Sequence, residues 1–169
     1  MSNNLSTQPR IAIIGGGLGG LALLLTLHRR GVSATLYERD IAFDARAHLG
    51  GSLDLGWKSG QRALRENGLQ DAFDQNSRPE GEEIRVYDAA GKIHLHLGGD
   101  GDDDHSRPPK PKEDGRPEID RTVLRKLLLD AVPADLVQWG HALSSVRALG
   151  NGQHELAFAN GTTTTCALL

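Results

Sequence analysis

The sequence contains a single cysteine, Cys166, and no long hydrophobic run. One cysteine cannot form an intrachain disulfide, which agrees with a reducing compartment. The longest apolar stretch, Leu21–Leu25, is far shorter than the roughly 20 residues that cross a bilayer. Residues 1–9 are polar and lack the apolar segment of a secretory signal. We therefore expect a cytoplasmic protein with no membrane partner and a disordered tail over residues 1–9.

The sequence also lacks an excess of positive charge. It has 19 lysines and arginines against 22 acidic residues, and its net charge is −3. Because nucleic-acid binding requires a basic face, this balance argues against a nucleic-acid partner. The length of 169 residues is sufficient for one domain.

The segment Arg10–Arg39 carries the clearest pattern in the chain. Its first part, Ile11–Ile14, is apolar without alternation, as in a strand buried on both faces of a parallel sheet. Three glycines follow in the order G-x-G-x-x-G: Gly15, Gly17 and Gly20. In a dinucleotide site the first allows a tight turn, the second lets a pyrophosphate approach the backbone, and the third lets the next helix pack on the strand. The segment therefore predicts a dinucleotide-binding strand and turn.

A helix and a second strand complete this unit. Leu21, Leu24, Leu25 and His28 can share one helical face, and Gly31 is placed to end the helix. The strand Ala34–Tyr37 then leads to Glu38, which follows Gly20 by 18 residues. An acidic residue about 20 residues after the glycines binds the ribose hydroxyls and would repel a 2′-phosphate. The expected tightly bound nucleotide is therefore FAD or NAD, not NADP.

The rest of the chain mixes strands, helices and turns. Asp40–Leu55 is expected to be a loop that carries Arg46 and Asp54, and the residues alone favour solvated surface charges at both positions. Residues 98–117 are rich in Gly, Pro and charge, and we expect a long mobile loop there. Two further helices are expected: one at Ser59–Asn67, and one within the ordered segment Glu118–Val132, with Asp120 as its N-cap. A hairpin is expected from Ile84–Tyr87 and Ile93–Leu97. Short strands are expected at Leu136–Trp139, Ala142–Ala148, His154–Phe158 and Thr163–Leu169.

Two patterns suggest metal sites and are rejected. His94 and His96 would share one strand face, but no third ligand is visible at a suitable spacing. The acidic run Asp100–Asp104 has neither the glycine nor the glutamate that an EF-hand loop requires. We therefore expect no metal site.

Arg121 lies at the start of the expected helix, one turn before Arg125. A cation in the first helical turn opposes the macrodipole. This placement suggests a contact with an anionic or polar ligand, although a solvated surface arginine explains it equally well.

Four stretches in this order resemble one family: IAIIGGGLGGLALLLTLHRRG, LYERD, GGSLDL and PEIDRTVLRKLLL. They are similar to the class A flavin-dependent aromatic-type monooxygenases, and in particular to the tetracycline-inactivating flavin monooxygenases. The resemblance extends over most of the chain from Arg10 to Leu169. It implies an enzyme that binds FAD and uses NADPH and O₂ to hydroxylate a small organic substrate through a flavin C4a-hydroperoxide. The cofactor carries this chemistry, and no side chain of the chain is expected to be a nucleophile or general base.

The resemblance also implies roles for individual residues. Glu38 matches the ribose-binding acid of the family, and Arg39 matches the arginine beside it. Asp54 matches a residue associated with FAD, and Arg121 matches the arginine that contacts the flavin. Arg46 matches a position linked to NADPH, with a spacing to the glycine pair that is one residue longer than in the family.

We expect an α/β fold: a Rossmann-like FAD-binding unit with a parallel sheet, β-hairpin additions, and a single domain over residues 10–169. The family is a little over twice as long, so we expect a chain truncated before its substrate domain is complete. Two alternatives stay open from the residues: an NAD-binding dehydrogenase domain, and a non-catalytic truncated relic that keeps the nucleotide-binding fold.

Overall fold

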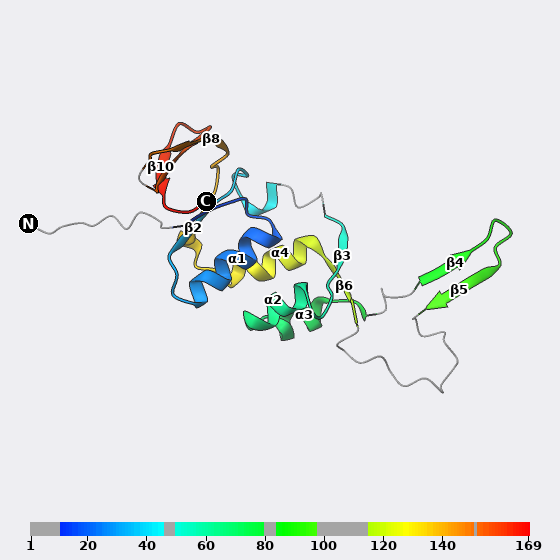
Figure 1. Ribbon diagram of the computed structural model, residues 1–169. Coiled ribbons are helices and arrows are strands. Elements are labelled where there is room, and N and C mark those ends of the chain that lie inside the picture. The colour runs from blue at the N-terminus through cyan, green and yellow to red at the C-terminus, as the bar shows by residue number, and fades with distance from the viewer. Residues whose placement is uncertain (1–10, 46–49, 80–83, 98–114, 151) are drawn as a thin grey trace, which may run out of the picture. The chain divides into compact units, whose positions relative to one another are not determined.

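The computed structural model describes residues 11–45, 50–79, 84–97, 115–150 and 152–169 (Figure 1). The predicted tail at residues 1–9, Arg46 and most of the predicted loop at 98–117 lie outside these ranges. The chain divides into two compact units, residues 1–50 with 125–169 and residues 51–124, and the boundary falls within one helix. The prediction of one domain over residues 10–169 stays a prediction.

The first unit is built on a parallel sheet of three strands in the order β1-β2-β7. Strands β1 (Ile11–Ile14) and β2 (Ala34–Tyr37) pair along their full length, and β7 (Val137–Gln138) pairs with the end of β2. The parallel sheet expected from the apolar run at Ile11–Ile14 is therefore present. Leu168 forms a parallel bridge with Ile11 at the other edge of β1, where the Ala12 N–H donates to the Leu168 carbonyl at 2.9 Å.

Helix α1 (Leu18–Arg29) connects the first two strands and buries three leucines of the predicted face, Leu21, Leu24 and Leu25. His28, which was expected on that face, is exposed because it lies in the last turn. Gly31 ends the helix as predicted: its φ is +70° and its N–H donates to the His28 carbonyl. The Val32 N–H reaches back to the Leu27 carbonyl, which completes a Schellman motif.

A second, antiparallel sheet in the first unit has the order β10-β9-β8. It consists of β8 (Leu143–Ala148), β9 (His154–Phe158) and β10 (Thr163–Cys166), drawn in orange to red in Figure 1. It packs against the parallel sheet through a buried cluster of Ala12, Tyr37, Leu156, Phe158 and Cys166. Since successive side chains of a strand point to opposite faces, Tyr37 faces this cluster while Leu36 faces α1, where it lies next to Gly20. The end of β2 is therefore packed between helix α1 on one face and the antiparallel sheet on the other.

The second unit contains a two-stranded antiparallel ladder, two short helices and a hairpin. The ladder pairs β3 (Ser52–Asp54) with β6 (Glu118–Asp120), and the helices are α2 (Gly60–Glu66) and α3 (Gln70–Asn76). The predicted hairpin is present as β4 (Ile84–Tyr87) and β5 (Ile93–Leu97). Helix α4 (Arg121–Asp130) begins directly after β6 and continues into residues of the first unit, in which the 3-10 turn Ala134–Leu136 leads to β7.

Two expectations for the segment from Asp40 to Asn67 are wrong in detail, and one helix was not predicted. The segment Asp40–Leu55 is not loop throughout, because Ser52–Asp54 forms β3. Helix α3 was not predicted, since its sequence is mostly polar and Phe73 is its only buried residue. Ser59 precedes α2 as expected but makes no capping hydrogen bond to the helix; its hydroxyl donates instead to the Gly56 carbonyl at 3.3 Å. None of the helices formed by the described residues has the length and apolar character needed to cross a membrane.

Candidate nucleotide-binding site

The glycine turn after β1 has the backbone geometry that the fingerprint predicts. Gly15 has a φ of +104°, a value that favours glycine, and its N–H donates to the Tyr37 carbonyl at 2.9 Å. A Cβ on Gly20 would lie 2.0 Å from the Gly15 carbonyl oxygen, so only glycine fits where α1 crosses the turn. A Cβ on Gly17 would meet no atom within 4 Å. Gly17 therefore borders open space rather than packed protein.

Helix α1 presents an N-terminus without a side-chain cap. Its N-cap residue is Gly17, no side chain bonds to the cap, and its first turn contains no acidic residue. The first N–H groups of a helix have no partner within the helix, and the helix dipole is positive at this end. The arrangement suits an anion such as a pyrophosphate.

Glu38 lies directly beside the glycine turn. Its side chain is almost completely buried, with 4% of the residue exposed. One carboxylate oxygen accepts a hydrogen bond from the Gly16 N–H, and the other accepts one from the Asp40 N–H at 3.0 Å. An ionised carboxylate only accepts hydrogen bonds, and this is the chemistry that the hydroxyls of a ribose diol require.

The backbone of Glu38 is fixed by the segment that follows β7. The Glu38 N–H donates to the Gln138 carbonyl at 2.9 Å, and the His141 N–H donates to the Glu38 carbonyl at 2.8 Å. The rings of Tyr37, His141 and Phe158 contact one another, with centroid distances of 4.8 to 5.6 Å. These contacts hold the end of β2 and with it the position of the carboxylate.

Arg125 holds the same turn from α4. Its Nε donates to the Gly16 carbonyl at 2.8 Å, and its Nη1 donates to the Phe43 carbonyl at 3.1 Å. The guanidinium also lies 5.3 Å from the Phe43 ring centroid and 5.7 Å from that of Trp139. Neither Arg125 nor Gly16 was predicted as a site residue; the only signal for Arg125 was its spacing of one helical turn after Arg121.

In the second unit, the ladder brings together two motifs that are far apart in the sequence. Ser52 pairs with Asp120, Asp54 pairs with Glu118, and the Arg121 N–H donates to the Gly51 carbonyl at 2.9 Å. The GGSLDL and IDR segments are thus neighbouring strands. Asp54 and Arg121 are both exposed, at opposite ends of the ladder.

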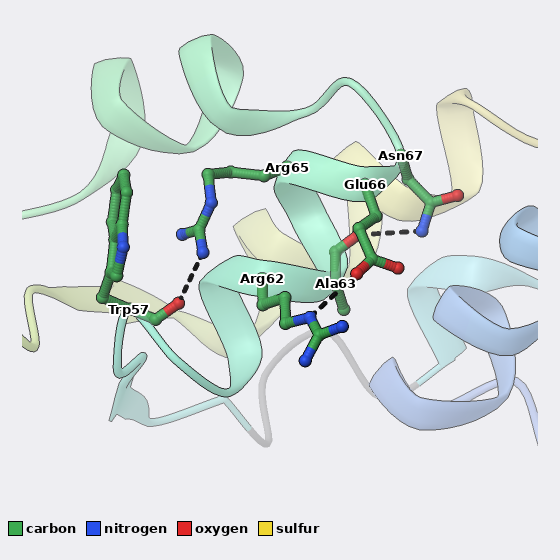
Figure 2. Close-up of polar contacts among 6 residues, drawn as sticks. All are labelled: Trp57, Arg62, Ala63, Arg65, Glu66 and Asn67. Carbon is green, nitrogen blue, oxygen red and sulfur yellow. Dashed lines mark hydrogen bonds and ion pairs between the residues drawn. The ribbon is translucent and has the colours of Figure 1, made fainter. Parts of the chain in front are cut away.

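Helix α2 fixes the loop that follows Asp54, as Figure 2 shows for Arg65 and Trp57. The Arg65 guanidinium lies 3.6 Å from the Trp57 ring centroid, and its Nη2 donates to the Trp57 carbonyl at 2.9 Å. The buried amide of Gln61 donates to the Leu55 carbonyl at 2.6 Å. Two side chains of α2 therefore hold the backbone just after β3.

The structure gives less information on the remaining residues that the sequence singled out, namely Arg39, Arg46, His94 and His96. Arg39 is exposed next to Glu38, and Arg46 lies outside the described residues. His94 contacts the Asp88 carboxylate at 2.9 Å, which lowers the pKa of Asp88, and His96 lies 3.4 Å from the Arg85 side chain. Among the residues the structure describes, no three His, Cys, Asp or Glu side chains cluster so as to hold a metal ion.

No model of a known protein family matches the chain, but individual proteins do. The 3-amino-4-hydroxybenzoate 2-monooxygenase PtmB3 of Streptomyces platensis is 32% identical over 166 residues, which are 96% of this chain and 38% of that protein. The 6-hydroxynicotinate 3-monooxygenase of Pseudomonas fluorescens is 30% identical over 163 residues, 94% of this chain and 39% of that protein.

Solved structures show the same fold. The 2,6-dihydroxypyridine-3-hydroxylase from Arthrobacter nicotinovorans matches with a TM-score of 0.71 and 19% identity over 94% of this chain and 35% of its own. The tetracycline destructase Tet(51) matches with a TM-score of 0.63 and 24% identity over 95% of this chain and 38% of its own. The predicted α/β fold is therefore confirmed.

Over nearly its whole length the chain is therefore similar to monooxygenases. The resemblance to FAD-dependent monooxygenases that the sequence predicts is confirmed. The chain spans somewhat more than a third of the length of the curated relatives given above, 38% and 39%.

Proposed function

We propose that this chain is the FAD-binding part of a flavin-dependent monooxygenase that uses NADPH and O₂ to hydroxylate a small organic substrate. One observation carries the proposal: the buried Glu38 carboxylate accepts the Gly16 N–H beside the uncapped N-terminus of α1. A carboxylate suited to a ribose diol and a helix end suited to a pyrophosphate are the two contacts that bind the ADP half of a dinucleotide.

The glycines of this chain fit such a cofactor. No protein atom lies within 4 Å of the position that a Cβ on Gly17 would take, so a ligand can approach the backbone closely there. Gly20 allows α1 to cross Gly15 at a distance that any side chain would prevent. The pyrophosphate would be held by backbone N–H groups of the turn and the first turn of α1, and the adenosine ribose by Glu38.

The remaining assignments rest on the family resemblance. Arg39 would lie near the adenosine half, and Asp54 and Arg121 would contact FAD from the β3–β6 ladder. Arg46 would contact NADPH. These roles are consistent with the exposure of Arg39, Asp54 and Arg121.

The protein and the cofactor would divide the chemistry between them. FAD reduced by NADPH supplies the electrons that activate O₂ for transfer of one oxygen atom to the substrate. The residues of this chain bind and orient the cofactor: Glu38 fixes the ribose, α1 neutralises charge on the pyrophosphate, and Arg125 keeps the glycine turn in place.

The test is an absorbance spectrum of the purified full chain, before and after titration with FAD, followed by NADPH under anaerobic conditions. We expect FAD to bind and its absorbance near the flavin maximum to be bleached by NADPH. NAD⁺ binding without FAD binding would overturn the proposal in favour of a dehydrogenase domain. FAD binding without reduction by NADPH would restrict the chain to a non-catalytic cofactor-binding role.

A further inference from the structure

The β3–β6 ladder is flanked by Arg78, which no motif of the sequence singles out. Its backbone forms a bridge with β6: the Arg78 N–H donates to the Glu118 carbonyl at 2.7 Å, and the Glu118 N–H donates to the Arg78 carbonyl at 3.2 Å. Strand β6 is therefore held on one side by β3 and on the other by Arg78. All of these residues belong to the second unit.

The Arg78 side chain contacts both acidic residues of β6. Its Nη2 lies 2.8 Å from an Asp120 carboxylate oxygen and 3.7 Å from one of Glu118. The hydrogen bond and the charge of Asp120 raise the pKa of Arg78, and the same contact lowers the pKa of Asp120. Both carboxylates therefore have a cationic partner other than Arg121.

Arg121 directly follows Asp120, and its exposed guanidinium makes no hydrogen bond or ion pair in the part of the chain that the structure describes. Consecutive Cα atoms are only about 3.8 Å apart, so Asp120 is the carboxylate nearest to Arg121 along the chain. A cation in the first turn of α4 gains nothing from the helix dipole. The Asp120 carboxylate, the nearest acidic group along the chain, is already bound by Arg78.

We propose that Arg78 is a positioning residue that binds Asp120 and Glu118 and so keeps the Arg121 guanidinium available for an anionic group of the cofactor. The proposal rests on the proposed function, because it is FAD that Arg121 would contact. Of the four charged groups gathered here, two acidic and two basic, Arg78 contacts both acidic ones, and the Arg121 guanidinium has no bonded partner among the described residues. Without Arg78, Asp120 would pair with Arg121 and compete with the cofactor.

A purely structural role for Arg78 makes a different prediction. If Arg78 only holds β6 in position, then removing the Asp120 charge cannot restore the availability of the Arg121 guanidinium in a variant that lacks the Arg78 side chain. If Arg78 acts by binding the Asp120 carboxylate, then adding Asp120→Asn should restore the availability of Arg121, because the competing carboxylate is gone. The double variant Arg78→Ala/Asp120→Asn separates the two roles.

The first measurement is independent of FAD. The full chain and its variants are treated with phenylglyoxal, which modifies accessible unpaired guanidinium groups, and the modification of Arg121 is followed by peptide mass spectrometry. We expect Arg121 to react readily in the parent, on the order of two- to fivefold more slowly in Arg78→Ala, in line with a partly exposed ion pair, and at the parent rate in the double variant. Arg78→Lys keeps a cation at the same place and should react like the parent.

The second measurement is FAD titration of the same set, with circular dichroism melts to confirm folding. Arg78→Ala should bind FAD about two- to fivefold more weakly, and the loss should shrink at high salt, since exposed pairs are screened. Arg62→Ala is the matched control, because Arg62 is an exposed arginine of the same unit whose ion pair, with Glu66 at 2.8 Å, lies outside the ladder (Figure 2). It should change neither readout.

The outcomes distinguish this inference from the proposed function. Equal Arg121 reactivity in the parent and Arg78→Ala, or a double variant as slow as Arg78→Ala, overturns the positioning role. Restored reactivity in the double variant together with absent FAD binding in the parent supports the positioning role and shows that the proposed cofactor is wrong.

Discussion

Arg125 and Gly16 are separated by 109 residues in the sequence, and the Arg125 Nε donates to the Gly16 carbonyl at 2.8 Å. The N–H of the same glycine donates to the Glu38 carboxylate. Both backbone groups of Gly16 are therefore bound by charged side chains of opposite sign. Charge-assisted hydrogen bonds are stronger than neutral ones, so this pair of contacts fixes the turn before any nucleotide binds.

Replacing Arg125 should loosen the glycine turn. In Arg125→Ala, the carbonyls of Gly16 and Phe43 both lose their donor, and we expect a decrease in the free energy of unfolding of roughly 1–3 kcal/mol. FAD affinity should fall as well. Chemical denaturation and FAD titration of the same preparation measure the two effects.

Lys126→Ala is the control for this change. Lys126 is the next residue of α4, is exposed, and forms an ion pair with Asp130 at 2.8 Å, one helical turn away. Its loss should alter the free energy of unfolding by no more than about 0.5 kcal/mol. Equal stability of the Arg125 and Lys126 variants would show that the contact with Gly16 contributes little.

Replacing Glu38 by glutamine should destabilise the chain even without nucleotide. Each carboxylate oxygen accepts one backbone N–H, from Gly16 and from Asp40. The amide of glutamine offers one acceptor and one donor group, so one of these buried N–H groups would face another donor. We expect a loss of roughly 1–3 kcal/mol in the free energy of unfolding, measured by thermal or chemical denaturation.

Asp44→Asn removes the same charge at an exposed position of the first unit and serves as the comparison. It should stay within about 0.5 kcal/mol of the parent. If Glu38→Gln were as stable as Asp44→Asn but bound FAD more weakly, the carboxylate would act on the nucleotide alone and not on the turn.

Local patterns in the sequence were sufficient to predict the strand, glycine turn, helix and strand at the start of the first unit. The apolar run Ile11–Ile14, the glycine spacing and the placement of Gly31 and Glu38 each specify structure within about 30 residues, and the structure shows β1, α1 and β2 with these bounds or close to them. Such signals are readable because strand, helix and turn each impose a period or a backbone angle.

Contacts between segments that are distant in the sequence could not be predicted from local patterns. Strand β3 has only three residues, too few to show a strand period, and it exists because β6 pairs with it across more than 60 residues of sequence. The hydrogen bond from Arg125 to Gly16 and the bridge between Arg78 and Glu118 likewise depend on tertiary structure. A charge pattern can place an arginine on a helix, but it does not identify the carbonyl or carboxylate that the arginine binds.

Gly20 and the neighbouring Gly19 should respond to alanine in opposite directions. A Cβ at Gly20 would lie 2.0 Å from the Gly15 carbonyl oxygen and 3.4 Å from Leu36, whereas a Cβ at Gly19 would meet nothing within 4 Å. Gly20→Ala should therefore destabilise the chain by roughly 1–3 kcal/mol or more through overpacking. Gly19→Ala should stabilise it by about 0.5–1 kcal/mol, because alanine favours the helix. Denaturation curves that coincide for the two variants would contradict the close crossing of α1 over the turn.

Gly17→Val separates nucleotide binding from folding. Gly17 has an ordinary φ of −77°, and a Cβ there would meet no protein atom within 4 Å. Valine should therefore be accepted in the folded chain with a melting temperature close to that of the parent, while its side chain occupies the space through which a pyrophosphate would approach the backbone. Gly15→Val is less informative, because the φ of +104° at Gly15 strains any side chain and would destabilise the fold at the same time. A folded Gly17→Val protein that still bound FAD with the parent affinity would show that the pyrophosphate does not lie at this turn.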